Sequence, residues 1–394
     1  MSKFREIAAA VSISIKSIKN RASMSLATVI GIALVILVLV GFLSMSHGFR
    51  EMLSRTGSPD VLIVTSKGSN SEADSVITGD DARIVSGLLE SSAKGGAVPR
   101  FSLEAYTVVP ARKRDDGGAL NLPLRGVGEN ALALRENFRL ASGRMFEPGS
   151  QEIIIGKALS AQAEGFDLGS TVSFGPAKWK IVGIFDTGGS ALESEIWGDL
   201  DVIRSFYRLD NTYQSIRIRE NVGARQDAIE RAITDTRQLN LQVVSEQEFF
   251  STQSRGISRM IEVLGWPLAM LMAVGALAGG LNTMHSSVAA RASEIGTLRI
   301  IGFGQLSTFA GVMAEAMTLA LVGAVLGLLS SYLLFNGMTA STVSSSLTSI
   351  SFTLALSIPI ALSALVLGLS VGLIGGAIAA WRAARQPILE TLSQ

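Results

Sequence analysis

The 394-residue chain contains no cysteine, only two histidines and only nine prolines. The lack of cysteine excludes disulfides, zinc–thiolate sites and thiol redox motifs, and His47 and His285 alone make a histidine-based metal site improbable. The formal net charge is +1, so the chain also lacks the basic excess typical of nucleic-acid binding. We therefore expect no metal site in this chain and no nucleic-acid partner.

Apolar sequence is what the chain has in abundance: 48% of its residues are hydrophobic, and its mean hydropathy is +0.39. Runs without acidic or basic residues predict four membrane-spanning helices, because about 20 apolar residues cross a bilayer core. They cover residues 22–46, 263–290, 306–335 and 352–381, and a polar, turn-rich loop at 336–351 separates the last two. The apolar core of the first is too long for a cleaved signal peptide, so we interpret it as a signal anchor.

Lys and Arg near the ends of these helices predict their orientation. Basic residues precede the first helix, occur at Arg291 and Arg299 between the second and third, and follow the fourth at Arg382 and Arg385. The loop at 336–351 has none. Both termini (1–21 and 382–394) and the segment 291–305 are thus expected in the cytoplasm, and residues 47–262 outside it.

The cytoplasmic N-terminal segment has a helical pattern. Five apolar residues recur at three- and four-residue spacing, which predicts an amphipathic helix at the membrane surface. They are Phe4, Ile7, Val11, Ile15 and Ile18. The alternative is a disordered basic leader.

Residues 47–262 alternate strand and helix patterns, which predicts an α+β domain. Strand–helix–strand units are expected at its two ends (50–115 and 212–250), with a hairpin-rich insertion between them (116–211). Thr78 is expected to cap a helix. From Glu246 the pattern stays helical without a strong breaker before Pro267, which predicts a stalk that extends the second membrane helix outward.

No catalytic arrangement is visible in this domain, and we expect the chain not to be an enzyme. Glu193 and Glu195 in SALESEIWGDL could be read as a glycosidase pair. Such a pair needs a cleft and a raised pKa. We interpret both carboxylates as part of a surface loop.

Three stretches resemble the FtsX/MacB-like permease family of ABC transporters. They are RASEIGTLRIIGFG at 291–304, FEPGSQEIIIGKALSAQAEGFDLGSTVSFGPAKWKIVGIF at 146–185, and AARQPILETL at 383–392. The order of elements, one span, a large outer domain and then three spans, resembles the family as well. The resemblance implies that the outer domain has a porter-like part, corresponding to its two ends, and a sabre-like insertion.

The resemblance also implies partners. Family members work as dimers with an ATPase, so 291–305 would be a coupling segment that docks into the ATPase, with Glu294 and Arg299 in polar contacts. Ile295, Leu298 and Ile301 would pack there. Arg291, Gly296 and Gly302 belong to the same motif and are counted among the ATPase-coupling residues. The alternative is a segment that merely turns the chain. No GxxxxGK[ST] motif occurs in the sequence, so ATP and magnesium are expected in a separate ATPase subunit.

The expected function is export or efflux by mechanotransmission, because the spans have no charged seam that could carry a hydrophilic solute. The expected assembly is a homodimer in the inner membrane, in contact with lipid, with a periplasmic adaptor and an outer-membrane duct. One alternative is an FtsX-like regulator of a cell-wall hydrolase, which would need a smaller outer domain. Another is extraction of lipid or lipoprotein from the outer leaflet, for which Phe249, Phe250 and Met260 could supply an apolar surface.

Small residues and one acid mark the spans. Glycines at small-xxx-small spacing predict close helix packing, within the bundle for most of them, with a dimer interface as the alternative. They are Gly275, Gly279, Gly323, Gly327, Gly368, Gly372 and Gly376. Glu315 lies inside the third span, where we favour a structural hydrogen bond or a place near the cytoplasmic surface over a proton relay with His285.

Overall fold

The computed structural model describes residues 3–18, 22–92, 98–135, 137–175, 177–220, 223–290, 296–297, 299–343 and 348–385. The chain divides into two compact units. We call one the helical unit, which comprises Met1–His47, Arg259–Met338 and Leu354–Gln394. The other is the sheet unit, which comprises Gly48–Ser258 and Thr339–Thr353.

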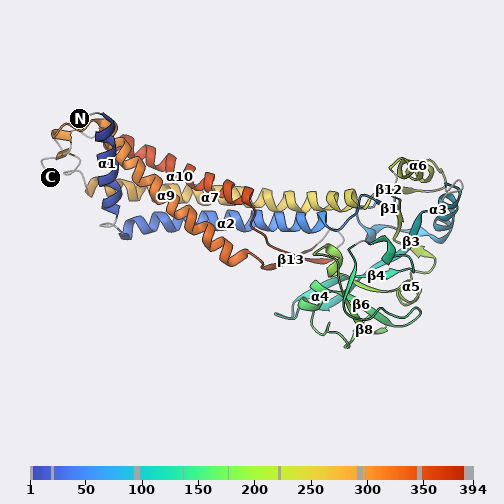
Figure 1. The fold of residues 1–394 in the computed structure, drawn as a ribbon. Helices are drawn as coiled ribbons and strands as arrows, with labels where there is room; N and C mark the ends of the chain where they lie inside the picture. Colours follow the sequence, from blue (N-terminus) through green and yellow to red (C-terminus); the bar gives the residue numbers. More distant parts are fainter. Residues whose placement is uncertain are drawn as a thin grey trace. The chain divides into compact units, whose positions relative to one another are not determined.

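Long apolar helices make up the helical unit (Figure 1). Within the described part of the chain, four helices are long and apolar enough to cross a membrane: α2 (Ala22–Ser54), α7 (Glu246–Ala290), α9 (Gln305–Phe335) and α10 (Ile358–Arg385). Ile36 and Leu39 of α2 are buried against small residues of the other helices, among them Ala320, Ala324 and Ala364. Small residues let helices approach closely where no hydrophobic effect drives them together.

The helix ends differ most from the expected spans in two places. α2 continues past residue 46 to Ser54, and α10 begins at Ile358 rather than at Phe352. The second difference arises because residues expected to open the fourth span pair as a strand, β14 (Ser349–Thr353). The predicted stalk is confirmed, since α7 runs as one helix from Glu246 through Pro267 into the second span.

The sheet unit is built on a ten-stranded sheet in the order β12-β1-β11-β3-β4-β9-β6-β8-β5, with β7 paired to β8. Its strands are β1 (Val61–Ser66), β3 (Arg100–Arg112), β4 (Ala119–Val127), β5 (Arg139–Gly143), β6 (Glu152–Gly156), β7 (Thr171–Phe174), β8 (Ala177–Asp186), β9 (Ile196–Asp199), β11 (Ser215–Arg219) and β12 (Leu241–Ser245). Two short strands, β2 (Ile77–Thr78) and β10 (Thr212–Tyr213), pair separately. The helices of this unit are α3 (Gly79–Ser92), α4 (Lys157–Gln162), α5 (Leu200–Tyr207) and α6 (Gly223–Thr234), with short 3-10 turns η2 (Glu72–Asp74), η3 (Leu132–Leu134) and η4 (Ala191–Ser194).

The sheet unit has separate hydrophobic cores along this sheet. In one, Val64, Ile216 and Ile218 of the strands pack with Val85 of α3 and Ile233 of α6. Another core lies in the region expected to be an insertion and includes Trp179, Ile155 and Phe174. The long hairpin of β3 and β4 carries the sheet from one core to the other, so the two parts share one continuous sheet.

Local signals in the sequence are confirmed in this unit. Residues of DDGG form the turn between β3 and β4, where Lys113 N–H donates to Gly118 O at 2.8 Å and Gly117 adopts φ +68°. The predicted cap of α3 is also present. The hydroxyl of Thr78 accepts from Asp81 N–H at 3.1 Å, and the Asp81 carboxylate accepts from Thr78 N–H at 3.2 Å.

The segment expected to be a polar loop between the third and fourth spans forms a β-hairpin. β13 (Thr339–Val343) pairs antiparallel with β14, and both strands belong to the sheet unit. Ile350 and Phe352 alternate with polar residues along β14 and are buried. The serines and threonines of this segment predicted a break, but the alternation with buried apolar residues is a strand pattern.

Candidate functional site

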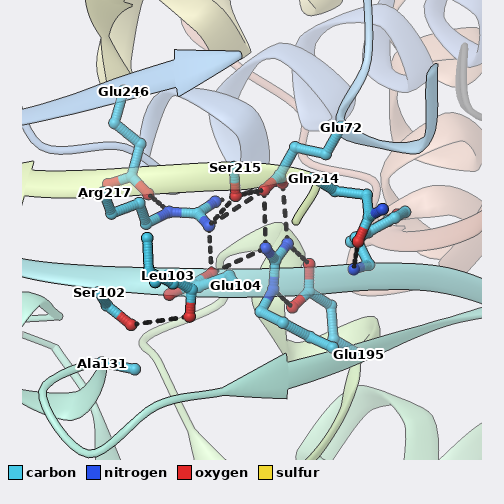
Figure 2. Close-up of polar contacts among 12 residues, drawn as sticks. Glu72, Ser102, Leu103, Glu104, Ala131, Glu195, Gln214, Ser215, Arg217 and Glu246 are labelled. Atoms are coloured by element: carbon cyan, nitrogen blue, oxygen red, sulfur yellow. Dashed lines mark hydrogen bonds and ion pairs between the residues drawn. The ribbon is translucent and has the colours of Figure 1, made fainter. Parts of the chain in front are cut away.

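A group of buried charged residues lies where the central strands of the sheet unit meet the start of α7 (Figure 2). It contains carboxylates and guanidinium groups that are each at most 8% exposed. We call this group the buried ion-pair network. Its members are Glu72, Glu104, Glu195, Glu246, Arg125, Arg135 and Arg217.

Three neighbouring strands position the centre of the network. Arg217 lies on β11, Glu104 on β3 and Arg125 on β4, and these strands are adjacent in the sheet. The register pairs Ser215 with Glu104 and Tyr106 with Arg125. Since alternate residues of a strand face the same side, Ser215 and Arg217 project toward the same group of carboxylates: the Ser215 hydroxyl donates to Glu72 at 2.6 Å, and Arg217 contacts Glu104.

Arg125 makes a two-pronged contact with each of two carboxylates. Its Nε and Nη2 donate to Glu195 at 2.7 Å each, and its Nη1 and Nη2 donate to Glu72 at 2.8 and 2.9 Å. The guanidinium carbon also lies 5.0 Å from the ring centre of Tyr106. The planar fork of arginine suits bidentate recognition of this kind, which fixes orientation as well as distance.

Arg217 connects the sheet to the stalk. Its Nε donates to Glu246 Oε1 at 2.8 Å, while its Nη1 donates to Glu72 Oε1 at 3.0 Å and also contacts Glu104. Glu246 is the first residue of α7, and its other oxygen accepts from Ser58 N–H at 3.3 Å. The network thereby holds the first turn of α7 to the central strands.

Arg135 adds a link from the region between η3 and β5. Its Nη2 donates to Glu104 Oε2 at 2.8 Å, and its guanidinium carbon lies 4.7 Å from the ring centre of Trp197. Trp197 in turn donates from Nε1 to Glu195 at 2.7 Å. The expected insertion contributes Arg125, Arg135 and Glu195, and the two ends of the domain contribute the other members, so the network joins both parts.

The arginines keep the central carboxylates ionised despite their burial. Burial alone would raise the pKa of Glu72, but the charges of Arg125 and Arg217 outweigh it and hold that pKa well below its usual range. Burial opposes ionisation of Glu104 in the same way, and Arg135, Arg217 and Arg125 lower its pKa to about 2. These acids are therefore charged and paired at neutral pH, which suits a rigid junction better than proton transfer.

The expectation for SALESEIWGDL is wrong, because this stretch is buried rather than a surface loop. Glu195 is paired with Arg125, and Glu193 accepts from the backbone N–H groups of Thr187 and Gly189 at 3.0 and 2.6 Å. Glu193 thus stabilises a turn. The described residues contain no cluster of three or more His, Cys, Asp or Glu that could hold a metal ion.

The predicted coupling segment is described only in part. Arg291, Glu294, Ile295 and Leu298 lie outside the described residues. Of the rest, Gly296 is buried, Arg299 is half-buried and Ile301 is 71% exposed. Gly302 lies in a turn before α9 and has φ +110°, a backbone angle that residues with a side chain rarely adopt.

The N-terminal helix α1 (Lys3–Ser17) packs against the start of α9. Glu6 of α1 accepts from Gly304 N–H at 2.5 Å and from the Ser307 hydroxyl at 2.7 Å. Gly304 precedes α9 and has no side chain of its own for capping, so the Glu6 carboxylate satisfies this helix end. The predicted helix is confirmed.

Glu315 and the glycines lie in the helical unit. Glu315 is buried and accepts from the Ser287 hydroxyl at 3.1 Å, while His285 lies 2.6 Å from Arg382. A Cβ added to most of the glycines would touch a neighbouring helix: Gly323 and Gly327 face α2, Gly368 faces α9 and α2, and Gly372 and Gly376 face α9. At Gly275 and Gly279 of α7, no described atom lies within 4 Å of that position.

Comparison with known proteins gives matches along most of the chain. The family model of the MacB-like periplasmic core domain matches residues 25–236, and that of the FtsX-like permease C-terminal region matches 268–388. The macrolide export ATP-binding/permease protein MacB of Bordetella avium (strain 197N) is 26% identical over 329 residues, which cover 77% of this chain and 48% of that protein. An uncharacterized ABC transporter permease of Methanocaldococcus jannaschii is 20% identical over 359 residues, which cover 85% of each chain.

Two solved structures also match the sheet unit. The extracellular domain of the noncanonic ABC-type transporter YknZ from Gram-positive bacteria has a TM-score of 0.35 at 17% identity and covers 47% of this chain and 100% of that chain. The periplasmic region of MacB from Actinobacillus actinomycetemcomitans has a TM-score of 0.36 at 10% identity, and the match covers 50% of this chain and 94% of that chain. The chain spans about half the length of the Bordetella MacB protein.

Proposed function

Because the chain belongs to the family of ABC transporter permeases with a MacB-like periplasmic core domain and an FtsX-like C-terminal region, we propose that it transmits ATP-driven motion to its sheet unit. In this proposal a separate ATPase subunit binds at 291–305. The chain itself contributes no catalytic residue. Substrate is moved by the sheet unit outside the membrane and does not pass through the four helices.

The observation that carries the proposal is the extent of α7. Its first residue, Glu246, is held in the buried ion-pair network, and its last, Ala290, directly precedes the predicted coupling segment. A continuous helix is stiff along its axis because successive turns are hydrogen-bonded to each other, and α7 lacks one of these bonds at Pro267, which has no N–H. A displacement at 291–305 would therefore reach the central strands through one element.

The orientation of the chain is part of the proposal. Arg299 and the pair Arg382 and Arg385 lie at helix ends that would then face the cytoplasm, as the positive-inside rule requires. The sheet unit would be periplasmic, in a protein of the inner membrane. A second copy of the chain, a periplasmic adaptor and an outer-membrane duct would complete an export assembly.

Extraction of lipid or lipoprotein is less well supported. Phe249 and Phe250 are buried and pack edge to face with ring centres 5.5 Å apart, so neither offers an open apolar surface. Met260 is 58% exposed on α7. We therefore propose export as the primary function. Regulation of a cell-wall hydrolase is the alternative, and the following experiment distinguishes the two.

The test is affinity capture of the full chain from native membranes in mild detergent, followed by mass spectrometry. We predict that an ATPase with a P-loop is recovered with the wild type. Ile301→Asp replaces an exposed apolar side chain of the coupling segment with a charged one, and Arg299→Ala removes one of the two arginines of the segment. An interface residue of this kind contributes about 2 kcal/mol, so each variant should weaken capture about thirtyfold.

Arg5→Ala is the matched control, because it removes an exposed cation from α1 and leaves the coupling segment intact. Its capture of the ATPase should equal that of the wild type. An adaptor in the same sample would support export, whereas a cell-wall hydrolase would support the regulator. Capture that is unaffected by Ile301→Asp and Arg299→Ala would show that the segment only turns the chain.

A further inference from the structure

The hairpin of β13 and β14 lies in the chain directly between the membrane helices α9 and α10. Asn336–Met338 alone separate α9 from β13, and Leu354–Ser357 alone separate β14 from α10. A connection of this length spans at most about 10 to 15 Å at full extension. The ends of two membrane helices are therefore tied closely to this hairpin.

Hydrogen bonds stiffen these connections further. Gly337 N–H donates to Leu354 O at 3.1 Å, and Leu354 N–H donates to Met338 O at 2.9 Å. They continue the ladder beyond the pair Thr339 and Thr353, toward the helix ends. Slack that would let the helices move without the hairpin is thus reduced.

Within the sheet unit, the hairpin is fastened to three elements of the insertion. Ser351 N–H donates to the Ser194 hydroxyl in η4 at 3.2 Å, and the Ser351 hydroxyl donates to the side-chain oxygen of Gln162 in α4. The Ser349 hydroxyl accepts from Asn121 N–H in β4 at 3.2 Å. An isolated two-stranded hairpin is marginally stable at best, so these contacts help hold it in place.

Apolar contacts add to the polar ones. Phe352 is 4% exposed and packs edge to face on Phe49 of α2, with ring centres 5.5 Å apart. Gly48 of α2 lies against the backbone of Thr353, where a side chain would collide. These contacts therefore fix the position of the hairpin within the sheet unit.

We propose that the β13–β14 hairpin is a second mechanical link, which couples α9 and α10 to the insertion while α7 acts on the central strands. Ser351 and Ser194 are positioning residues of this link. The proposal rests on the proposed function, since it needs helices that move with the ATPase cycle. It gives the insertion a connection to α9 and α10 in addition to the one that it has to α7 through the buried ion-pair network.

The experiment measures distances by pulsed electron paramagnetic resonance in the complex with its ATPase, with and without vanadate-trapped nucleotide. The chain has no cysteine, so within this chain spin labels attach only at introduced positions, and the chain is labelled before the ATPase is added. One pair joins Leu333→Cys on α9 to Lys178→Cys in the insertion. The other joins Leu333→Cys to Asp227→Cys on α6. All three positions are exposed.

We expect a nucleotide-dependent shift in both pairs of the wild-type background. Ser194→Ala/Ser351→Ala removes two of the hydroxyls that fasten β14, and the shift at Lys178 should then become smaller while that at Asp227 is unchanged. Ser341→Ala is the matched control, since Ser341 is paired directly opposite Ser351 and is exposed. It should leave both shifts unchanged.

The outcomes separate the two proposals. A shift at Lys178 that keeps its full size in Ser194→Ala/Ser351→Ala would overturn the hairpin link and leave the proposed function standing. Loss of both shifts in that variant would also overturn it, because the effect would not be confined to the insertion. No shift in either pair of the wild-type background would contradict the proposed function itself.

Discussion

At the scale of single residues, the buried ion-pair network fixes geometry more than it adds stability. Desolvation of buried ions offsets much of their attraction, so a paired network contributes little over apolar packing. Loss of one partner is different, because it leaves a charge buried without compensation. Glu104 is the most informative member, since it contacts Arg125, Arg135 and Arg217.

Glu104 should make the stability of the sheet unit depend on pH. Its pKa is about 2 in the folded chain and 4.5 for an ordinary glutamate, so its contribution is fully present above pH 4.5. It is lost as pH falls toward 2, because the unfolded state then binds the proton first. This difference corresponds to about 3 kcal/mol.

We predict that Glu104→Gln lowers the free energy of unfolding of the sheet unit by about 3 kcal/mol at pH 7 and flattens its fall between pH 4.5 and 2. Urea titration of the full chain in detergent measures both, followed by tryptophan fluorescence in a background with Trp266→Phe and Trp381→Phe, so that the signal comes from the buried Trp179 and Trp197. Glu230→Gln, at an exposed carboxylate of α6, is the control. If the free energy of unfolding of Glu104→Gln depended on pH as it does in the wild type, the arginines would not be lowering the pKa of Glu104.

Sequence reasoning could not find this network. Its members are far apart in the chain: Glu72, Arg125 and Arg217 come together only through strand pairing and a short turn. Arg217 in SIRIR and Arg125 in LNLPLRGV alternate with apolar residues, which is also the pattern of a half-exposed strand. Periodicity identifies the strand but does not reveal that its polar face is covered.

At the scale of elements, glycine positions decide how closely the membrane helices approach. Gly372 of α10 lies against Ala320 of α9, and an added Cβ would collide with the Ala320 side chain. Gly275 of α7 has no described neighbour at that position. Both residues lie within helices, so the same substitution at each separates packing from helix propensity.

Gly372→Val should destabilise the helical unit by about 1–3 kcal/mol through overpacking. Gly275→Val should have a much smaller effect on a single chain. Thermal unfolding of both variants in the same detergent, read from circular dichroism of the helices, gives the comparison. Equal losses for the two variants would mean that the α9–α10 approach is not tight at Gly372.

Hydrophobic pattern and turn residues were sufficient to predict most elements. The expected span at 306–335 corresponds to α9, and the expected stalk from Glu246 corresponds to the first part of α7. Long apolar or amphipathic runs of this kind have few alternatives to a helix. The β13–β14 hairpin was missed because its serines and threonines are also typical of loops. Ile350 and Phe352 alternate with polar residues there, but their burial comes from contacts made within the sheet unit, which no local pattern contains.

At the scale of the whole molecule, the account makes the chain a transmitter rather than a conduit. α7 joins the predicted coupling segment to the buried ion-pair network, and the β13–β14 hairpin joins α9 and α10 to the insertion. Both connections consist of hydrogen-bonded elements with short or no linkers. Motion of the helices should therefore appear in the sheet unit.

The most direct measurement is hydrogen exchange of the native complex, compared between the nucleotide-free state and the vanadate-trapped state. The account predicts altered exchange in the first turns of α7 and in β11 and β3, which carry Glu246, Arg217 and Glu104. Changes confined to the ATPase and the membrane helices, with an unaltered sheet unit, would contradict mechanotransmission.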